Sequence, residues 1–324
     1  MASAALGISA VGAGVAASDH LTDYPVLSAQ AVRYAIGAAL LYAVARATRL
    51  AEPRTRLAPG DRVRLVALAL TGMVLFNVAV VRAVTTGEPA VVATIVGLAP
   101  VGLALVVPAV ERRRPSAGIL AGAALAAAGA AVVEGFGRAD GAALAWSVVA
   151  LGCEVAFTAL AAPLLRTLSP IGLSVRVCGL ASVLLLAAAA LLDGTGGFAA
   201  PGPGEIAAIA YLAVASTAVA FVLWYRAVAH LGAERAGLFA GLMPVSAALV
   251  GAAVTAASLQ AGTLLGTALV GAGIAVGAKG GRKGGRWSAT RPPVSATGAR
   301  EVDESDAVRV HSPRPEPSHR LAVE

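Results

Sequence analysis

Between Arg235 and Lys279 the chain contains no aspartate, glutamate, lysine or arginine. The hydrocarbon core of a bilayer is about 30 Å thick and needs about 20 apolar residues per helix, so this window can hold two membrane-spanning helices. Of the 324 residues, 58% are hydrophobic and 13% are charged, with a mean hydropathy of +0.79. A soluble domain carries about 25% charged residues. The chain lacks the polar surface of a soluble fold, and we predict an all-α integral membrane protein.

Apolar runs bounded by charged or turn residues predict ten transmembrane helices. The first run is short; it is kept because a polar turn follows it and because the sixth run needs a partner in the duplication described next. The predicted helices cover residues 3–18, 28–45, 65–82, 89–110, 117–134, 141–163, 170–192, 205–225, 236–256 and 259–278.

The chain repeats itself at an offset of 144 positions, without gaps. Matches among alanine, leucine and valine arise easily by chance in such a sequence, whereas matches among proline, glycine and arginine at one offset do not. The matched pairs are Pro100 with Pro244, Gly97 with Gly241, Gly118 with Gly262, Gly122 with Gly266, Gly129 with Gly273 and Arg82 with Arg226. We infer that the protein is a duplicated membrane protein.

Each half of the duplication holds five predicted spans. Because five is odd, the second half must enter the membrane from the opposite side to the first. We therefore predict two inverted five-helix repeats, residues 1–137 and 138–278, followed by a disordered cytoplasmic tail, residues 279–324. Inverted repeats recur in secondary transporters, with the substrate site near the bilayer midplane. Some channels share this arrangement, so the architecture favours transport without proving it.

Arginine is concentrated in alternate loops. Twelve arginines fall in four loops on one side of the predicted topology, and two, Arg82 and Arg138, fall on the other. The four arginine-rich loops are residues 46–64, 111–116, 164–169 and 226–235. Positive charge favours the cytoplasmic side, so both termini are expected in the cytoplasm, in the inner membrane of a bacterium. This distribution accounts for the net charge of +7 without a nucleic-acid partner.

Four stretches carry a family resemblance: QAVRYAIGAALL from Gln30, PVGLALVVPAVERRRPSAGILAGAALAAAG from Pro100, LSVRVCGLASVLLL from Leu173, and FVLWYRAVAHLGAERAGLFAGLMPVSAALV from Phe221. They resemble EamA-type members of the drug/metabolite transporter superfamily. The resemblance spans nearly everything but the tail. It implies ten helices and secondary transport, often export of amino acids, amines, drugs or other small metabolites. The sequence departs from the family pattern after the fourth span, where the acidic Glu111 is matched in the second half by Thr255. That departure puts in doubt any mechanism that needs the acid twice.

Glu154 is the sharpest candidate for chemistry because it lies near the middle of the span 141–163. A lone carboxylate there must be protonated, paired or hydrated. It either binds a substrate ammonium or a coupling proton, or it forms a structural ion pair with Arg176 on the next helix. Arg33 and Arg176 enter their spans near opposite membrane faces. They either frame the two mouths of a pathway or extend to lipid headgroups.

Pro100 and Pro244 can free backbone carbonyls and kink their helices. Because they recur at one offset, we predict a gating or cavity role for both, with a simple packing kink as the alternative. Asn77 and Thr94 are expected to be polar lining residues of the substrate pathway.

The glycine pairs Gly118-xxx-Gly122 and Gly262-xxx-Gly266 open the fifth and tenth spans, and their spacing indicates close helix packing. Trp224 and Tyr225 stand at the end of the predicted eighth span, where an aromatic pair is typical of an interface anchor.

Motifs of other function classes are missing from the sequence. It has no GxxxxGK[ST] phosphate loop and no cluster of metal-ligand residues, so neither ATP hydrolysis by a P-loop nor a cofactor or metal is expected. A membrane enzyme would have only Asp19 and His20 near an interface, and we expect no enzymatic activity.

The predicted function is secondary transport of small metabolites, working as an exporter by alternating access of the two repeats. A facilitative channel or a lipid-carrier flippase component is the alternative. The expected partners are a small-molecule substrate, the lipid bilayer and a coupling proton, and a homodimer is left open.

Overall fold

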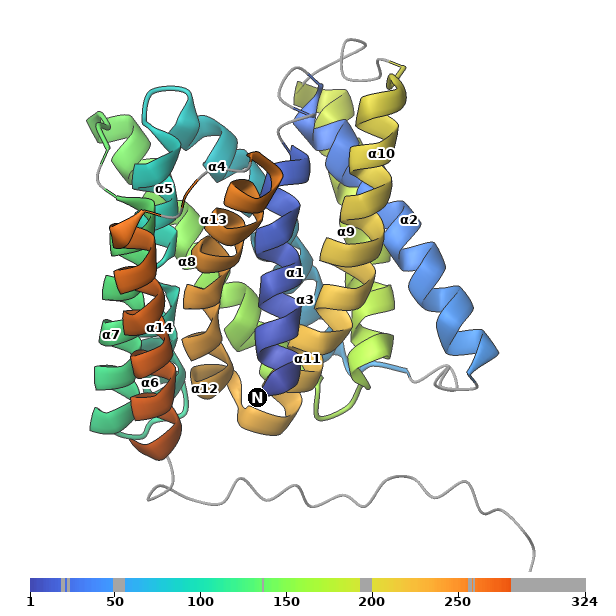
Figure 1. Ribbon diagram of the computed structural model, residues 1–324. Coiled ribbons are helices and arrows are strands. Elements are labelled where there is room, and N and C mark those ends of the chain that lie inside the picture. Colours follow the sequence, from blue (N-terminus) through green and yellow to red (C-terminus); the bar gives the residue numbers. More distant parts are fainter. Residues whose placement is uncertain are drawn as a thin grey trace, which may run out of the picture. The chain divides into compact units, whose positions relative to one another are not determined.

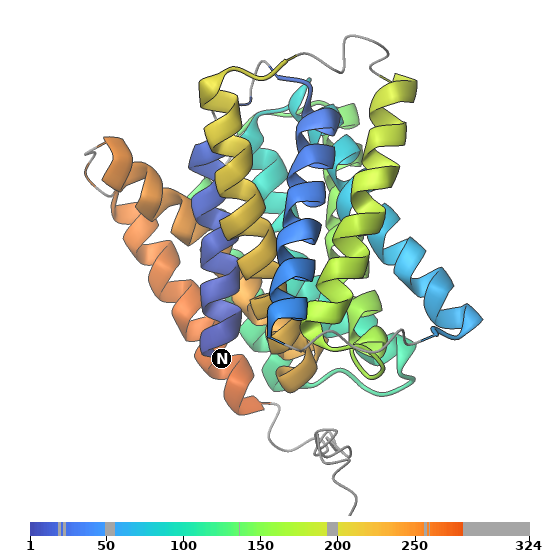
Figure 2. The ribbon, with the colours of Figure 1, turned by 90° about the vertical axis from the view of Figure 1, so that its right-hand side faces the viewer.

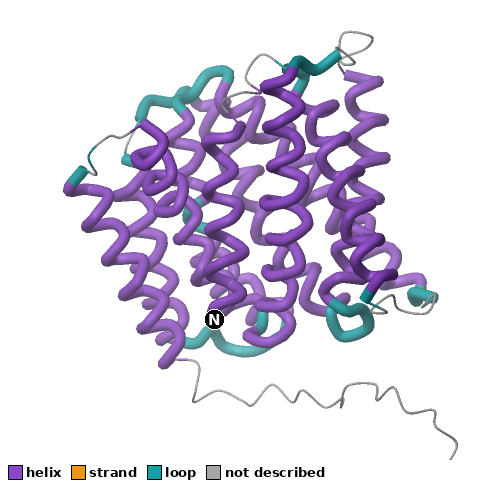
Figure 3. The backbone as a smooth tube through the Cα atoms, turned by 45° about the vertical axis from the view of Figure 1, so that its right-hand side comes forward, coloured by secondary structure: helices purple, strands orange, loops and turns teal. Residues whose placement is uncertain are grey.

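A computed structural model describes residues 1–18, 21, 24–48, 56–135, 137–192, 200–255, 258 and 260–280, with the backbone alone for residues 15–18. Over these residues the protein is helical, with loops only at helix ends and breaks (Figure 3). An isolated antiparallel bridge joins Gly87 to Ala139. Asp19, His20 and the predicted tail beyond residue 280 lie outside the described residues.

Nine helical spans in the described part of the chain are long and apolar enough to cross a membrane. A further helix, α1 (Ala2–Ser18), is apolar over a shorter stretch, Ala2–Gly14. The nine spans are α2 (Val26–Ala47), α3–α4 (Pro59–Val84), α5–α6 (Pro89–Val110), α7 (Ala117–Glu134), α8 (Gly141–Leu164), α9 (Pro170–Leu192), α10–α11 (Pro203–Leu231), α12–α13 (Ala233–Thr255) and α14 (Ala261–Gly280). The all-helical membrane fold predicted from composition is confirmed.

Four spans change helix type or break midway, at matching places in the two halves. In the first half, the third span has a π segment, Leu70–Leu75, between α3 (Pro59–Ala69) and α4 (Phe76–Val84), and the fourth span breaks between α5 (Pro89–Val96) and α6 (Ala99–Val110). In the second half, the eighth span has a π segment, Leu212–Val219, between α10 (Pro203–Tyr211) and α11 (Ala220–Leu231), and the ninth has a 3-10 turn, Leu238–Gly241, between α12 (Ala233–Gly237) and α13 (Leu242–Thr255).

Helices of the two halves pack against each other in pairs. α7 lies beside α14, and α2 lies beside α9 (Figures 1 and 2). α1 packs on α11 and α13, and α8 packs on α4 and α6. When each helix is replaced by the helix that matches it in the other half (its repeat-mate), the pairs α7–α14 and α2–α9 map onto themselves, and the two contacts of α1 map onto the two contacts of α8. The packing therefore carries the internal symmetry that the sequence offset predicts.

The connections α6–α7, α8–α9 and α11–α12 lie at the same end of the bundle as the start of α1 (Figure 1). This end, which we call the arginine-rich end, carries Arg112, Arg113, Arg114, Arg166 and Arg235. The loops with Thr86 and Arg138 lie at the opposite end.

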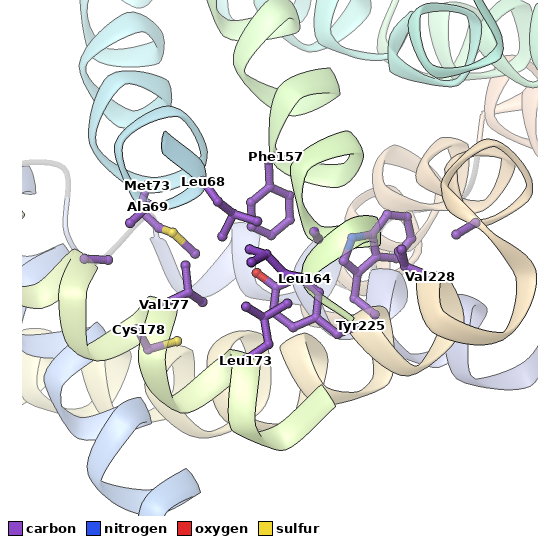
Figure 4. Close-up of a cluster of buried hydrophobic side chains, with 14 of the residues drawn as sticks. Leu68, Ala69, Met73, Phe157, Leu164, Leu173, Val177, Cys178, Tyr225 and Val228 are labelled. Carbon is purple, nitrogen blue, oxygen red and sulfur yellow. The ribbon is translucent and has the colours of Figure 1, made fainter. Parts of the chain in front are cut away.

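The buried core gathers side chains from both halves (Figure 4). Leu68 and Met73 come from the third span, Phe157 and Leu164 from α8, and Tyr225 from α11. The core therefore joins the two halves instead of forming one centre in each.

α7 and α14 cross with their backbones in contact. A Cβ added at Gly122 would lie 2.6 Å from the carbonyl oxygen of Gly273, and one added at Gly129 would lie 2.7 Å from that of Gly266. In lipid, where apolar surfaces gain little by leaving the solvent, small residues of this kind allow close van der Waals packing. The packing role predicted for Gly122 and Gly266 is confirmed, and the two contacts exchange when the halves are swapped.

We predict that Gly122→Ile destabilises the protein, because the new side chain would overlap the α14 backbone. Overpacking of this kind costs roughly 1–3 kcal/mol, or more where backbones must separate. The matched control is Gly271→Ile, since Gly271 is exposed on α14 and has open space around its Cα. Thermal unfolding in detergent should show a lower melting temperature for the first variant only. Equal melting temperatures would contradict the proposed role of this crossing.

Candidate functional site

Glu154 lies on α8 and is partly exposed within the bundle. Its carboxylate forms no hydrogen bond or ion pair with the described residues. The guanidinium of Arg176, on α9, donates to the carbonyl oxygen of Gly172 at 3.0 Å. Glu154 and Arg176 form no ion pair with each other in the described structure.

Four aromatic rings form a connected cluster that includes Phe157, one helical turn after Glu154 on α8. Phe157 lies on the same face of α8 as Glu154. The centroid of Phe157 lies 5.9 Å from that of Phe221 and 5.8 Å from that of Tyr225, both on α11. Tyr34, on α2, lies 6.1 Å from Phe221. Glu154 is near enough to both tyrosines to affect them electrostatically.

Three polar atoms near this cluster are buried without a hydrogen-bond partner in the described protein. They are the hydroxyl oxygens of Thr158 and Tyr225 and the indole nitrogen of Trp224. Thr158 follows Glu154 by four residues and so shares its face of α8. A buried polar atom without a partner costs about 1–3 kcal/mol, so such atoms point to a water or a ligand.

The expectation that Trp224 and Tyr225 anchor the lipid interface is wrong. Both side chains are buried, with 5% of Trp224 and 0% of Tyr225 exposed. The cause is the length of the span, which continues through α11 to Leu231 instead of ending at residue 225. The aromatic pair therefore lies more than one turn inside the bundle, and Tyr225 points among core side chains (Figure 4).

Asn77 lies just after the first π segment, and its side chain hydrogen-bonds to a backbone carbonyl of that segment. A π-helical turn displaces the regular i→i−4 pattern, and such segments are frequent at functional sites. The Asn77 amide donates to the carbonyl oxygen of Met73 at 2.5 Å. Its side chain also lies next to the Tyr34 hydroxyl, which brings Asn77 to the edge of the aromatic cluster.

Arg33 reaches from α2 to the second π segment, in the other half of the chain. Its Nε donates to the Thr217 hydroxyl at 2.7 Å, and its Nη2 donates to the Ser216 carbonyl oxygen at 3.3 Å. The guanidinium also lies 5.2 Å from the centroid of the Tyr34 ring. Arg33 thus points into the bundle instead of extending to a headgroup, and it holds Tyr34 and the π segment in place.

Pro100 and Pro244 stand directly after the breaks in the fourth and ninth spans. Pro100 is the second residue of α6, and Pro244 is the third residue of α13. Proline has no N–H, so the carbonyls of Val96 and Ala240, four residues earlier, lose their regular helical donor. The α-helix is interrupted just before each proline, by a turn before Pro100 and by a 3-10 turn before Pro244. Thr94 lies on α5, and its hydroxyl donates at 3.0 Å to the carbonyl oxygen of Gly135, directly after α7.

Sequence and structure comparisons agree with this arrangement. The model of the EamA-like transporter family matches residues 1–134 and, a second time, residues 141–277. The chain belongs to the EamA-like transporter family. This confirms the resemblance drawn from the sequence and makes the protein a multi-pass membrane transporter built from two repeats.

No curated protein matches this EamA-like transporter. Among solved structures, 27 chains match it. One, titled "Crystal structure of protein", superposes with a TM-score of 0.73 at 19% sequence identity, covering 86% of this chain and 96% of the other. At that identity the likeness shows the shared fold alone.

The EamA-like transporter also has a surface pocket that the sequence did not predict. It lies at the end opposite the arginine-rich end, has a volume of about 560 Å³ and is lined by residues 84–89 and 138–140. The Ala143 N–H, at 2.7 Å, and the Thr86 hydroxyl, at 2.9 Å, donate to Asp140 and lower the pKa of its carboxyl. Asp140 thus caps α8 and fixes the loop, which explains its position without a ligand.

We predict that Arg33→Lys weakens the join between α2 and the second π segment. Lysine keeps the positive charge but lacks the planar guanidinium, whose two nitrogens donate to Thr217 and Ser216 at the same time. Loss of a buried hydrogen-bonded contact should cost roughly 1–3 kcal/mol of stability. Thermal unfolding in detergent tests this, with the exposed Arg82→Lys as the control.

Thr217→Val removes the acceptor for Arg33 Nε and should destabilise the protein in the same way. If the two side chains act through one contact, the double variant should lose less than the sum of the single losses. Unchanged stability of Arg33→Lys, or strictly additive losses, would contradict this role.

Proposed function

We propose that this EamA-like protein is a secondary transporter that exports small metabolites carrying an amine, such as amino acids, amines or cationic drug-like compounds. The observation that carries the proposal is the carboxylate of Glu154, which has no ion-pair partner among the described residues and lies one helical turn from Phe157 of the four-ring cluster. An ammonium group is attracted both by a carboxylate and by the faces of aromatic rings. The unpartnered hydroxyls of Thr158 and Tyr225 provide bonds for the polar atoms of such a substrate.

The site draws on both halves of the chain. Tyr34 and Asn77 belong to the first family match, and Glu154, Phe221 and Tyr225 belong to the second. A site shared between two bodies is the arrangement that alternating access requires, because relative motion of the halves changes its exposure to each side. Glu154 is also the proposed carrier of the coupling proton, since a carboxylate without a fixed counter-ion can exchange a proton for a cationic substrate.

We propose that the two repeats are inverted, with the arginine-rich end in the bacterial cytoplasm. Five spans in each half, helix pairs that exchange with their repeat-mates and breaks at matching positions support inversion. The positive-inside rule supports the orientation. Pro100 and Pro244 then mark equivalent hinges that open toward opposite sides of the membrane.

A facilitative channel or a lipid-carrier flippase component is the alternative. The tight aromatic packing favours a carrier, because Tyr34 and Tyr225 are 5% and 0% exposed and an open pore would wet them. An enzyme would rest on Asp19 and His20, which lie outside the described residues, whereas the matched family is one of transporters.

An efflux screen tests the substrate class. Cells with and without the protein would be exposed to matched sets of amines, amino acids, neutral compounds and organic acids, with intracellular retention measured. We expect lower retention of amine-bearing compounds in cells that contain the protein. The compound that responds most would then be loaded into proteoliposomes for counterflow, where saturable exchange distinguishes a carrier from a channel.

We predict that Glu154→Gln lowers the apparent affinity in counterflow by about tenfold or more, since a bond to a charged group is worth roughly 1.5–3 kcal/mol. The pH dependence of exchange should flatten as well. Glu88→Gln is the control, because Glu88 is an exposed carboxylate beyond the bundle. Wild-type rate and pH dependence in a well-folded Glu154→Gln variant would remove Glu154 from the mechanism.

A further inference from the structure

An ion pair joins the two halves at the arginine-rich end. Arg113, in the loop between α6 and α7, donates through Nη2 to the carboxylate of Glu234, the second residue of α12. Its Nε donates to Glu111 at 2.6 Å, and its backbone N–H donates to the carbonyl of Pro108 at 2.9 Å. The loop thus holds the guanidinium toward α12.

Glu234 is almost withdrawn from solvent. Its side chain is 10% exposed, and its Oε1 is buried without a hydrogen-bond partner in the described protein. A carboxylate in this setting depends on its one cationic partner, and removal of that partner leaves a buried charge. Removing Arg113 alone therefore costs free energy, because the buried Glu234 carboxylate loses its partner. The loss of one member of an ion pair at an open surface costs little.

Directly inside the ion pair, α12 packs on α6. A Cβ added at Gly237 would lie 2.5 Å from Cδ1 of Leu103, so the two helices touch with a glycine against a leucine. Leu103 is 1% exposed. The pair between Arg113 and Glu234 thus covers a closed contact between the fourth and ninth spans.

The described residues show no matching ion pair at the opposite end. The offset of 144 positions places Glu234 on Ala90 and Arg113 on Ala257, neither of which carries a charge. Among the described helices, α5, the repeat-mate of α12, does not pack on α13 as α12 packs on α6. Likewise, α8 packs on α12, whereas their mates α1 and α5 show no comparable contact. Among the described helices, the fourth and ninth spans therefore pack more extensively at the arginine-rich end than at the other.

We propose that the Arg113–Glu234 pair is the gate at the cytoplasmic end of the transport pathway. It forms when the fourth and ninth spans close that end and breaks each time the site opens to the cytoplasm. Because its repeat-mates are uncharged, the two access states differ in energy, and the cytoplasm-closed state is favoured at rest. The gate rests on the proposed alternating access, but its opening can be measured without a substrate.

The test uses Leu103→Cys as a reporter beneath the gate. The native Cys153 and Cys178 are buried, and both would be replaced by serine. A membrane-impermeant maleimide is applied to inside-out vesicles, and the labelling rate at position 103 is followed. We expect slow labelling with Arg113 and Glu234 present. Glu234→Gln and Arg113→Gln should each raise the rate by roughly 5-fold to 100-fold, the usual range of a coupling between two states.

Two further variants separate gating from damage. Arg114→Gln removes a neighbouring arginine that forms no ion pair in the described structure, and it should leave the rate unchanged. The exchange Arg113→Glu with Glu234→Arg restores the pair and should return the rate toward that of the parent. Val107→Cys, one turn nearer the same end on α6, replaces the reporter if Leu103→Cys does not fold.

Unchanged labelling in both single variants, or a failure of the exchanged pair to slow it, would overturn the gate. Labelling that responds as predicted in a protein without amine transport would sustain the gate and remove the substrate proposal. Amine transport by a protein whose labelling rate at position 103 does not respond would sustain the substrate proposal and remove the gate. The two proposals therefore fail separately.

Discussion

The close crossing of α7 and α14 is the contact on which the two-repeat structure depends. Lipid offers apolar helices no gain from leaving the solvent, so association requires close packing or polar contacts. Gly122 and Gly129 allow close packing, because they let the backbones of the two halves touch. Other contacts between the halves use side chains: Arg33 reaches Thr217, and Arg113 reaches Glu234. Side-chain contacts can be exchanged for others without separating the backbones.

The polar groups inside the bundle fall into two kinds. Arg33 and Asn77 donate to backbone carbonyls in or beside the π segments, where the helical pattern leaves carbonyls that need partners. Glu154, Thr158 and Tyr225 lack such bonds. The first kind contacts the backbone of the scaffold, and the second kind is the one that we propose binds a substrate, a proton or water. An arrangement of this sort keeps the scaffold intact when the site is empty.

The sequence predicted the spans and the duplication well, because long apolar runs and matching prolines and glycines are local signals. Pro100 and Pro244 located the helix breaks. The aromatic cluster was missed: Tyr34 and Phe221 come from helices 187 positions apart, and only folding brings them together. Tyr225 was assigned to the interface because its span was ended too early. The bond from Arg33 to Thr217 likewise depends on packing between the halves, which helical periodicity does not encode.

The proposed transport mechanism depends most on the opposite orientation of the two repeats, and one labelling measurement tests it. Thr86 and His230 are repeat-mates under the 144-residue offset, and both are exposed at helix ends. Each would be replaced by cysteine in turn and treated in intact cells with a membrane-impermeant maleimide. Inverted repeats predict labelling at position 86 from outside and at position 230 only after the membrane is permeabilised. Labelling of both positions from the same side would contradict inversion and the alternating-access mechanism built on it.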